Sequence, residues 1–313
     1  MYWHEFAYIV VMISKKINTW LGIFKKTFTL FSNSNALKFS ASLSYYTFFS
    51  LCPFLIVIIS LAGLLYGTEA VQGKVYTQIS GLVGKDAATQ IEHIILNIQK
   101  THHSVLGGII GFIVLIVGAS GVFSEIQGSI NSMWEIKDKP QTKGWVRLLV
   151  NKLWSFSLLA SVVFILLVSL TANALIDVLS ERLKQYFASY VIYLFYVLNI
   201  VFIFLIIAIL FAIIFRVLPD AYIKWKDAFI GGAFTAVLFL IGKLLIGIYL
   251  GSSSISTTYG ATASIAIIML WVYYSSIILY FGAAFTKIYV SVKHKDQTMH
   301  VKSKGMKKSF TNA

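Results

Sequence analysis

Residues 191–215 read VIYLFYVLNIVFIFLIIAILFAIIF, and this segment decides the fold class of the chain. No charged residue occurs between Lys184 and Arg216, and Asn199 is the only strongly polar residue at the centre of the run. A helix needs about 20 consecutive apolar residues to cross a hydrocarbon core of roughly 30 Å. The segment therefore predicts a transmembrane helix.

Five further segments show the same pattern. The chain is 58% hydrophobic and only 12% charged, whereas soluble domains carry about 25% charged residues. The predicted spans cover residues 43–66, 105–123, 148–175, 191–215, 228–250 and 261–290. We therefore expect an all-α polytopic membrane protein with six transmembrane helices.

The distribution of Lys and Arg predicts the orientation. The formal net charge is +14, and about twenty basic residues fall in the terminal and alternate connecting segments, against about five in the remaining connections. Basic residues are retained on the cytoplasmic side, so both termini are expected in the cytoplasm. Because topology accounts for the charge, nucleic acid is not an expected partner, whereas membrane lipids are. A homo-oligomer is left open.

The segments outside the spans predict two smaller helical elements. Residues 1–38 are expected to form a cytoplasmic amphipathic helix on the membrane surface, followed by the transmembrane domain at 39–290 and a basic cytoplasmic tail at 291–313. The predicted apolar face of this helix contains Ile13, Ile17, Trp20, Leu21, Phe24 and Phe28. The alternative is an ordinary helix packed on the bundle. Residues 67–104 are expected to form a small helical cap at the outer side.

Metal and cofactor sites are not predicted. Cys52 is the single cysteine, and the six histidines form no HxxxH pair, so no recognisable zinc pattern is present. A cluster of carboxylates suited to hydrolysis is also missing from the sequence. We expect no cofactor and no catalytic residue.

Lys243 is the outstanding charge at membrane depth. It lies in the predicted span 228–250 with apolar residues on both sides. Ionisable groups inside a membrane are costly and usually face a cavity or a partner. The alternative is that the lysine extends to the outer headgroups, which lie only about two turns away. Both interpretations stay open at this stage.

Two stripes of small or polar residues occur in the first two spans. Ser42, Tyr46 and Ser50 are four residues apart, and they predict either a polar pathway or a hydrogen-bonded seam between helices. Glu125 lies beside a second stripe, where another helix is expected to pack closely. The second stripe consists of Ser120, Ser124, Gly128 and Ser132.

Glu125 needs a partner at that depth. Lys243 and the pair Tyr45 and Tyr46 are the candidates, although the two charges are expected near opposite membrane faces. A third small-residue face, Ala228, Gly232 and Ala236, predicts close helix packing. The uncharged connection 251–260 is expected to re-enter the membrane.

Four stretches give the chain a family resemblance. They are SLSYYTFFSLCP at 42–53, GASGVFSEIQGSINSMW at 118–134, LPD at 218–220 with WKDA at 225–228, and GK at 242–243 leading to TYGA at 258–261 and LW at 270–271. In order and spacing they resemble the YihY/BrkB family of bacterial inner-membrane proteins, for which a ribonuclease label once circulated. The resemblance implies six transmembrane helices with both ends inside. The motif residues taken as structural are Pro53, Gly128, Trp134, Pro219, Asp220, Trp225, Gly260 and Trp271.

The resemblance supplies no settled activity, so three hypotheses follow. The first is transport or flipping of an amphiphile, such as an anionic lipid, through an intramembrane polar crevice. The second is a scaffold that maintains envelope integrity without transport. The third, an enzyme such as a nuclease, is disfavoured because no catalytic constellation is found. The residues expected to line the crevice are Tyr45, Tyr46, Ser50, Glu125, Lys243 and Tyr259.

Overall fold

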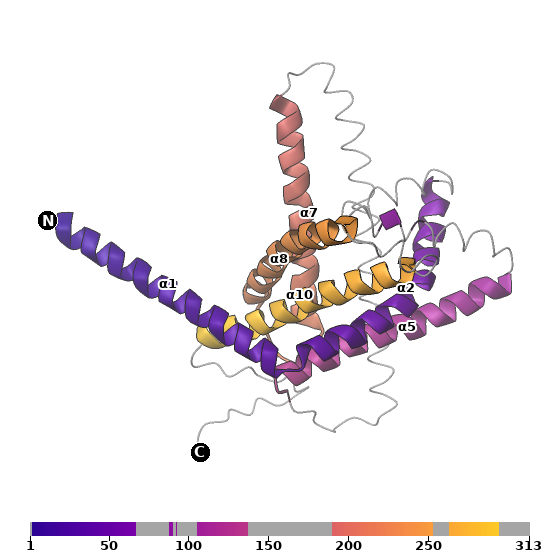
Figure 1. Ribbon diagram of the computed structural model, residues 1–313, viewed down its shortest axis with the longest axis horizontal. Helices are drawn as coiled ribbons and strands as arrows, with labels where there is room; N and C mark the ends of the chain where they lie inside the picture. The colour runs from indigo at the N-terminus through magenta and orange to yellow at the C-terminus, as the bar shows by residue number, and fades with distance from the viewer. Residues whose placement is uncertain are drawn as a thin grey trace.

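The computed structural model describes residues 2–66, 88–89, 92, 105–136, 190–252 and 263–293. The main elements are α-helices, arranged as Figure 1 shows: α1 (Tyr2–Asn33), α2 (Ala36–Tyr66), α5 (Val105–Met133), α7 (Tyr190–Val217), α8 (Trp225–Ser252) and α10 (Ala263–Lys293). The all-helical expectation is confirmed for these residues. The predicted span 148–175 and most of the segments 67–104, 251–260 and 291–313 lie outside them.

Three described helices are long and apolar enough to cross a membrane. Their qualifying windows are Ile200–Val217, Trp225–Tyr249 and Ile265–Lys293, and they match the predicted spans 191–215, 228–250 and 261–290. Helices satisfy all their backbone hydrogen bonds internally, which is why they are favoured in hydrocarbon. The complete count of six spans stays a prediction.

The helices end where the backbone chemistry requires it. Asn35 has a φ of 55° and separates α1 from α2, since asparagine tolerates the left-handed region better than most residues. At the end of α5, Glu135 has a φ of 57°, and the Ile136 N–H donates to the Asn131 carbonyl at 2.9 Å. This is the bonding of a Schellman cap. Pro219 follows α7 and cannot continue its hydrogen bonding.

One end of the bundle collects six helix ends. The last turns of α1, α5, α7 and α10 lie there with the first turns of α2 and α8. We call it the basic end, because these turns contain or adjoin Arg216, Lys224, Lys226 and Lys293. Figure 1 shows α1 projecting away from it, while α2 and α5 leave it side by side. Helix α10 contacts α1, α2 and α8. It is therefore the central helix of the described bundle.

The α8–α10 crossing is built from two matching pentapeptides, GGAFT at 231–235 and GAAFT at 282–286. A Cβ placed on Gly231 would meet Thr286, and one placed on Gly282 would meet Thr235. Each threonine hydroxyl donates to the glycine carbonyl of its own helix at 2.7 Å. Because the helices run in opposite directions, the four residues form a reciprocal lock.

The α7–α8 pair approaches closely through the predicted small-residue face. Ala228 and Ala236 are fully buried, and a Cβ on Gly232 would lie 2.7 Å from the backbone nitrogen of Ala212. Small residues allow such close approach of two helix backbones. The packing role predicted for this face is confirmed.

Helix α1 packs on the bundle through part of its apolar face. Trp20 stacks on Phe285 at a centroid separation of 6.3 Å, and Ile23 and Thr27 are buried. Leu21 and Phe28, which the sequence placed on the same face as Trp20, are 61% and 65% exposed. The face that contacts the bundle is thus rotated from the predicted one. The location of α1 at a membrane surface stays a prediction.

Candidate functional site

The family-like stretches at 118–134 and 218–220 meet at the basic end through Asp220. The Asn131 side-chain amide donates to Asp220 Oδ2 at 2.8 Å, and the Asp220 backbone N–H donates to Asn131 Oδ1 at 3.0 Å. The Gln127 amide also donates to Asp220 Oδ1 at 3.3 Å. Asp220 therefore ties the end of α5 to the turn between α7 and α8.

Trp134 ties the same end of α5 to α10. Its indole N–H donates to the Ala283 carbonyl at 3.1 Å, and the Lys287 ammonium donates to the Met133 carbonyl at 3.1 Å. Lys287 Nζ also lies 3.9 Å from Glu135 Oε1. A cation at the carbonyl end of a helix is favourable because the helix dipole is negative there.

The stretch 225–228 adds a connection between α8 and α10. Lys293 Nζ lies 2.9 Å from Asp227 Oδ1, and the Asp227 side chain is only 2% exposed. Trp225 is 58% exposed, with the Arg216 guanidinium 5.8 Å from its ring centroid. Trp134 and Asp220 thus join helices directly, whereas Trp225 lies at the surface.

Two of the predicted crevice residues lie in the seam between α2 and α5. Ser50 Cβ would be 2.9 Å from a Cβ placed on Gly118, and the Tyr46 ring would be 3.0 Å from one placed on Gly121. Ser50 is buried, and its hydroxyl donates to the Thr47 carbonyl of its own helix at 3.0 Å. Of the two interpretations of the 42/46/50 stripe, packing between helices fits these contacts.

The neighbouring residues extend this surface. Tyr45 is 55% exposed, and its ring lies 4.8 Å from that of Phe49. On the other side of α2, the Ser44 hydroxyl donates to the Met269 carbonyl of α10 at 2.8 Å. Tyr45 therefore lies on the outside of the α2–α5 pair, whereas Ser44 joins that pair to α10.

Glu125 finds partners that the sequence did not predict. The Ser129 hydroxyl, one turn further along α5, donates to Glu125 Oε1 at 3.3 Å. Across the interface, Tyr280 of α10 is fully buried, and Ser129 and Glu125 are the polar groups beside its hydroxyl. This hydroxyl makes no hydrogen bond of good geometry with the described residues.

The small-residue stripe beside Glu125 is largely uncovered among the described residues. Ser124, Gly128 and Ser132 are exposed, and no described atom lies within 4 Å of a Cβ placed on Gly128. The close approach on α5 instead uses Gly118 and Gly121. No described helix packs closely on Gly128, and a partner helix for the stripe stays a prediction, because small residues permit an approach without specifying the partner.

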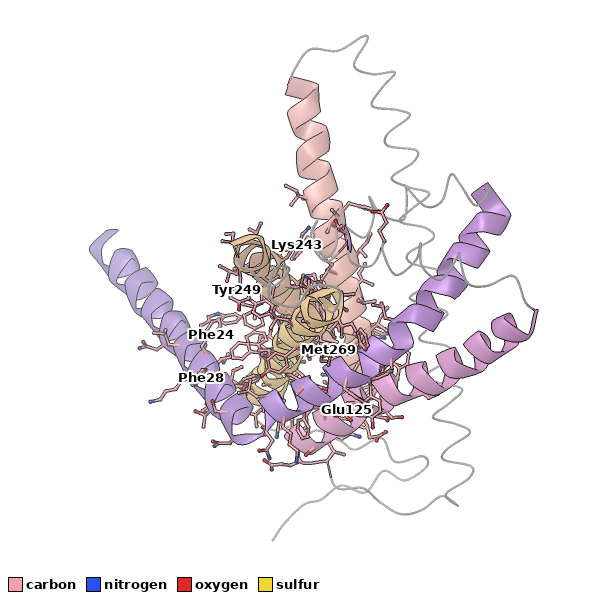
Figure 2. The ribbon with its side chains drawn as sticks, turned by 45° about the vertical axis from the view of Figure 1, so that its right-hand side comes forward. Phe24, Phe28, Glu125, Lys243, Tyr249 and Met269 are labelled. Carbon is pink, nitrogen blue, oxygen red and sulfur yellow. The ribbon has the colours of Figure 1, made fainter. Side chains whose placement is uncertain are left out.

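Lys243 is half-buried on α8, far from Glu125 along the bundle. It lies 18 residues beyond the start of α8, or roughly 27 Å at 1.5 Å per residue. Glu125 lies only eight residues from the end of α5, or roughly 12 Å. Figure 2 shows the two side chains well apart. The two charges are thus separated along the bundle, and their depths in the membrane stay a prediction.

The surroundings of Lys243 differ from one side of α8 to the other. A Cβ on the adjacent Gly242 would lie 2.7 Å from the Tyr274 ring and from Ile278 of α10. On the other side, Leu244 and Ile248 are 67% and 70% exposed. Lys243 therefore lies at the border between a packed face and an exposed apolar face.

The remaining predicted residues have varied positions. Tyr259 and Gly260 lie outside the described residues. Pro53 falls within α2, which continues through it, and Pro219 is buried after α7. The Trp271 ring packs edge-on against Phe239 at 5.9 Å.

Several important residues were missed at the sequence level. Tyr280 could have been noticed only as a tyrosine in an apolar helix, and Asn131 as an amide beside the small-residue stripe. The repeat of Gly-x-Ala-Phe-Thr in two segments was a readable signal for the α8–α10 lock. Among the described residues, no group of three or more His, Cys, Asp or Glu could hold a metal ion.

Comparison with known proteins identifies the family. The family model described as Virulence factor BrkB matches residues 27–305. The chain belongs to this family. The resemblance found from the sequence motifs is thereby confirmed.

Curated relatives carry the name UPF0761 membrane protein. One from Verminephrobacter eiseniae is 26% identical over 253 residues, which cover 79% of this chain and 57% of the relative. One from Kangiella koreensis is 29% identical over 269 residues, covering 84% and 62%. The chain thus spans about half the length of the curated relatives it matches. No solved structure matches.

These names agree with the apolar helices and make the chain an integral membrane protein of the BrkB family. The printed names carry no catalytic activity and no substrate.

Proposed function

We propose that this protein lies in the bacterial inner membrane, with the basic end in the cytoplasm, and moves an amphiphile across the bilayer. The positive-inside rule supports this orientation, because Lys and Arg concentrate in the segments at the basic end. The cargo we propose is a lipid-like molecule with an anionic headgroup. Lys243 would attract that headgroup through its positive charge.

The observation that carries the proposal is the separation of Lys243 and Glu125 (Figure 2). If the two charges formed an ion pair, each would compensate the other, and a structural role would suffice. Instead they lie on different helices, at different distances from the basic end. Charged groups at membrane depth are expensive and usually mark a pathway. We therefore assign them to two polar sites that a headgroup passes in sequence.

A second candidate function is a scaffold that maintains the envelope without transport. The contacts of Tyr46 and Ser50 in the α2–α5 seam favour it, because these side chains pack helices together. In this case Lys243 would extend to the headgroups and tolerate substitution. A metal-dependent nuclease is disfavoured, because the described residues contain no group of three or more His, Cys, Asp or Glu that could hold a metal ion.

A lipid-translocation assay in proteoliposomes separates these functions. The purified chain is compared with Lys243→Ala, Glu125→Gln and the control Lys224→Ala, which removes an exposed lysine at the α7–α8 turn. We expect translocation of anionic lipid by the native chain and the control, and at least tenfold slower translocation by the two test variants. Transport no faster than in empty liposomes would favour the scaffold.

A further inference from the structure

An open cavity lies at the basic end, where α1, α5 and α10 meet. Its volume is about 680 Å³, within the range of about 300–1,000 Å³ typical of small-molecule sites. The lining is mostly polar: Lys25, Lys26, Thr29, Leu30, Asn33, Ser34, Asn35, Ser132, Met133, Glu135 and Ile288. None of these residues belongs to the proposed translocation sites.

The charges around the cavity favour an anion. Lys25 and Lys26 contribute two ammonium groups from α1, and Glu135 is the single carboxylate in the lining. Lys287 lies 3.9 Å from that carboxylate and offsets part of its charge. The lysine ammonium groups and the asparagine side-chain amides supply N–H donors, and phosphate oxygens accept hydrogen bonds from such groups.

The backbone around the cavity is unusual at two points. Asn35 and Glu135 are the non-glycine residues with positive φ in the described chain, and both line this cavity. Non-glycine residues in this region cost free energy and gather at functional sites. Asn35 and Glu135 lie just after the ends of α1 and α5, so that the polar residues of both turns face the same cavity.

The arrangement of side chains around α1 favours a lipid headgroup as the source of the anion. Successive residues of a helix are rotated by about 100°, so the side chains of α1 fall into three sectors. Ile23 and Thr27 face the bundle, and Leu21 and Phe28 are exposed. Between them, Lys25, Thr29 and Asn33 face the cavity. Phe24 of the same helix instead packs on the bundle, with its ring centroid 5.7 Å from that of Phe234 and 6.1 Å from that of Phe285. An exposed apolar sector beside a cationic one suits a molecule that has both acyl chains and an anionic head.

We infer that this cavity binds the phosphate-bearing headgroup of an anionic membrane lipid, with the acyl chains against Leu21 and Phe28. The lysines hold the phosphate, and the Asn35 side-chain amide donates a further hydrogen bond to it. Such a site would anchor α1 to the membrane at the basic end. The inference does not require translocation.

Native mass spectrometry of the purified full chain tests the site. The chain is titrated with phosphatidylglycerol, with phosphatidylcholine as the neutral comparison. We expect preference for phosphatidylglycerol, and at least tenfold weaker binding of it by the Lys25→Gln/Lys26→Gln variant. The matched control is Lys224→Gln/Lys226→Gln, which removes two exposed lysines outside the cavity lining and should change binding less than twofold. Thermal unfolding checks that both variants are folded.

A second variant separates the cavity from general surface charge. Asn35→Gly keeps the left-handed backbone and removes the amide without changing the net charge, and we expect two- to threefold weaker phosphatidylglycerol binding. Unchanged binding by Asn35→Gly, or equal losses in the two lysine variants, would overturn the inference. Displacement of the lipid by an equal concentration of inorganic phosphate would reassign the cavity to a soluble anion. Lipid binding without translocation would leave the inference intact and contradict only the proposed function.

Discussion

The α8–α10 crossing and the α2–α5 pair both depend on glycines, but they use them differently. In the α8–α10 crossing each helix supplies one glycine and one threonine, and Thr235 and Thr286 are fully buried. In the α2–α5 pair both glycines come from α5, and Tyr46, which packs on one of them, is 41% exposed. The first contact is therefore closed on all sides, whereas the second has room to adjust.

This difference divides the described bundle into a rigid part and a more tolerant part. The rigid part contains α7, α8 and α10, joined by Gly232 against α7 and by the reciprocal lock. The tolerant part contains α2 and α5. The hydrogen bonds of Asp220, Trp134 and Ser44 connect the two parts. Substitutions of glycine in the rigid part should therefore lower stability more than those in the tolerant part.

The largest effect is expected for Gly282→Ala. The added Cβ would lie 2.8 Å from Thr235 Cγ2, and neither helix can move without breaking the second half of the lock. Overpacking of this kind costs about 1–3 kcal/mol, and more where the neighbours cannot shift. Thermal unfolding in detergent should show a clear loss of stability. In the control Gly247→Ala, no described atom lies within 4 Å of the added Cβ, so stability should hardly change. Equal losses of stability in the two variants would contradict the lock.

An intermediate effect is expected at the connection between the two parts. Asn131→Ala removes both hydrogen bonds between Asn131 and residue 220. Asp220→Ala removes the side-chain bonds from Asn131 and Gln127 but keeps the backbone N–H that donates to Asn131 Oδ1. Each should cost about 1–2 kcal/mol, because the remaining partner is left part-buried and unpaired. The double variant should cost less than the sum of the two, since both single variants remove the same side-chain hydrogen bond. Additive losses in a double-mutant cycle would show that the residues act independently.

The smallest effect is expected for Gly121→Ala in the tolerant part. The new Cβ would lie 3.0 Å from Tyr46 Cδ1, and the half-exposed ring can move aside. We expect a loss below about 1 kcal/mol, partly offset by the better helix propensity of alanine. The comparison is Gly128→Ala, which meets nothing within 4 Å. A loss as large as that of Gly282→Ala would remove the distinction between the two pairs.

The sequence by itself determined which segments are helical and apolar, and the motifs that identify the family. Runs such as 191–215 are local features, because hydropathy and length depend only on neighbouring residues. The predicted face Ala228, Gly232 and Ala236 was also correct, since small residues at i+4 spacing mark a close approach. The separation of Glu125 and Lys243 along the bundle followed from counting along the chain.

The tertiary structure decided which faces meet. The stripe at Ser124 and Gly128 had the same small-residue spacing as the Gly232 face, yet it is exposed among the described residues. In the same way, Ser129 and Tyr280 became the neighbours of Glu125, and α1 turned Ile23 and Thr27 toward the bundle. Spacing along one helix fixes which residues share a face. The partner of that face depends on the rotation of a second helix, which is set by packing between residues distant in the chain.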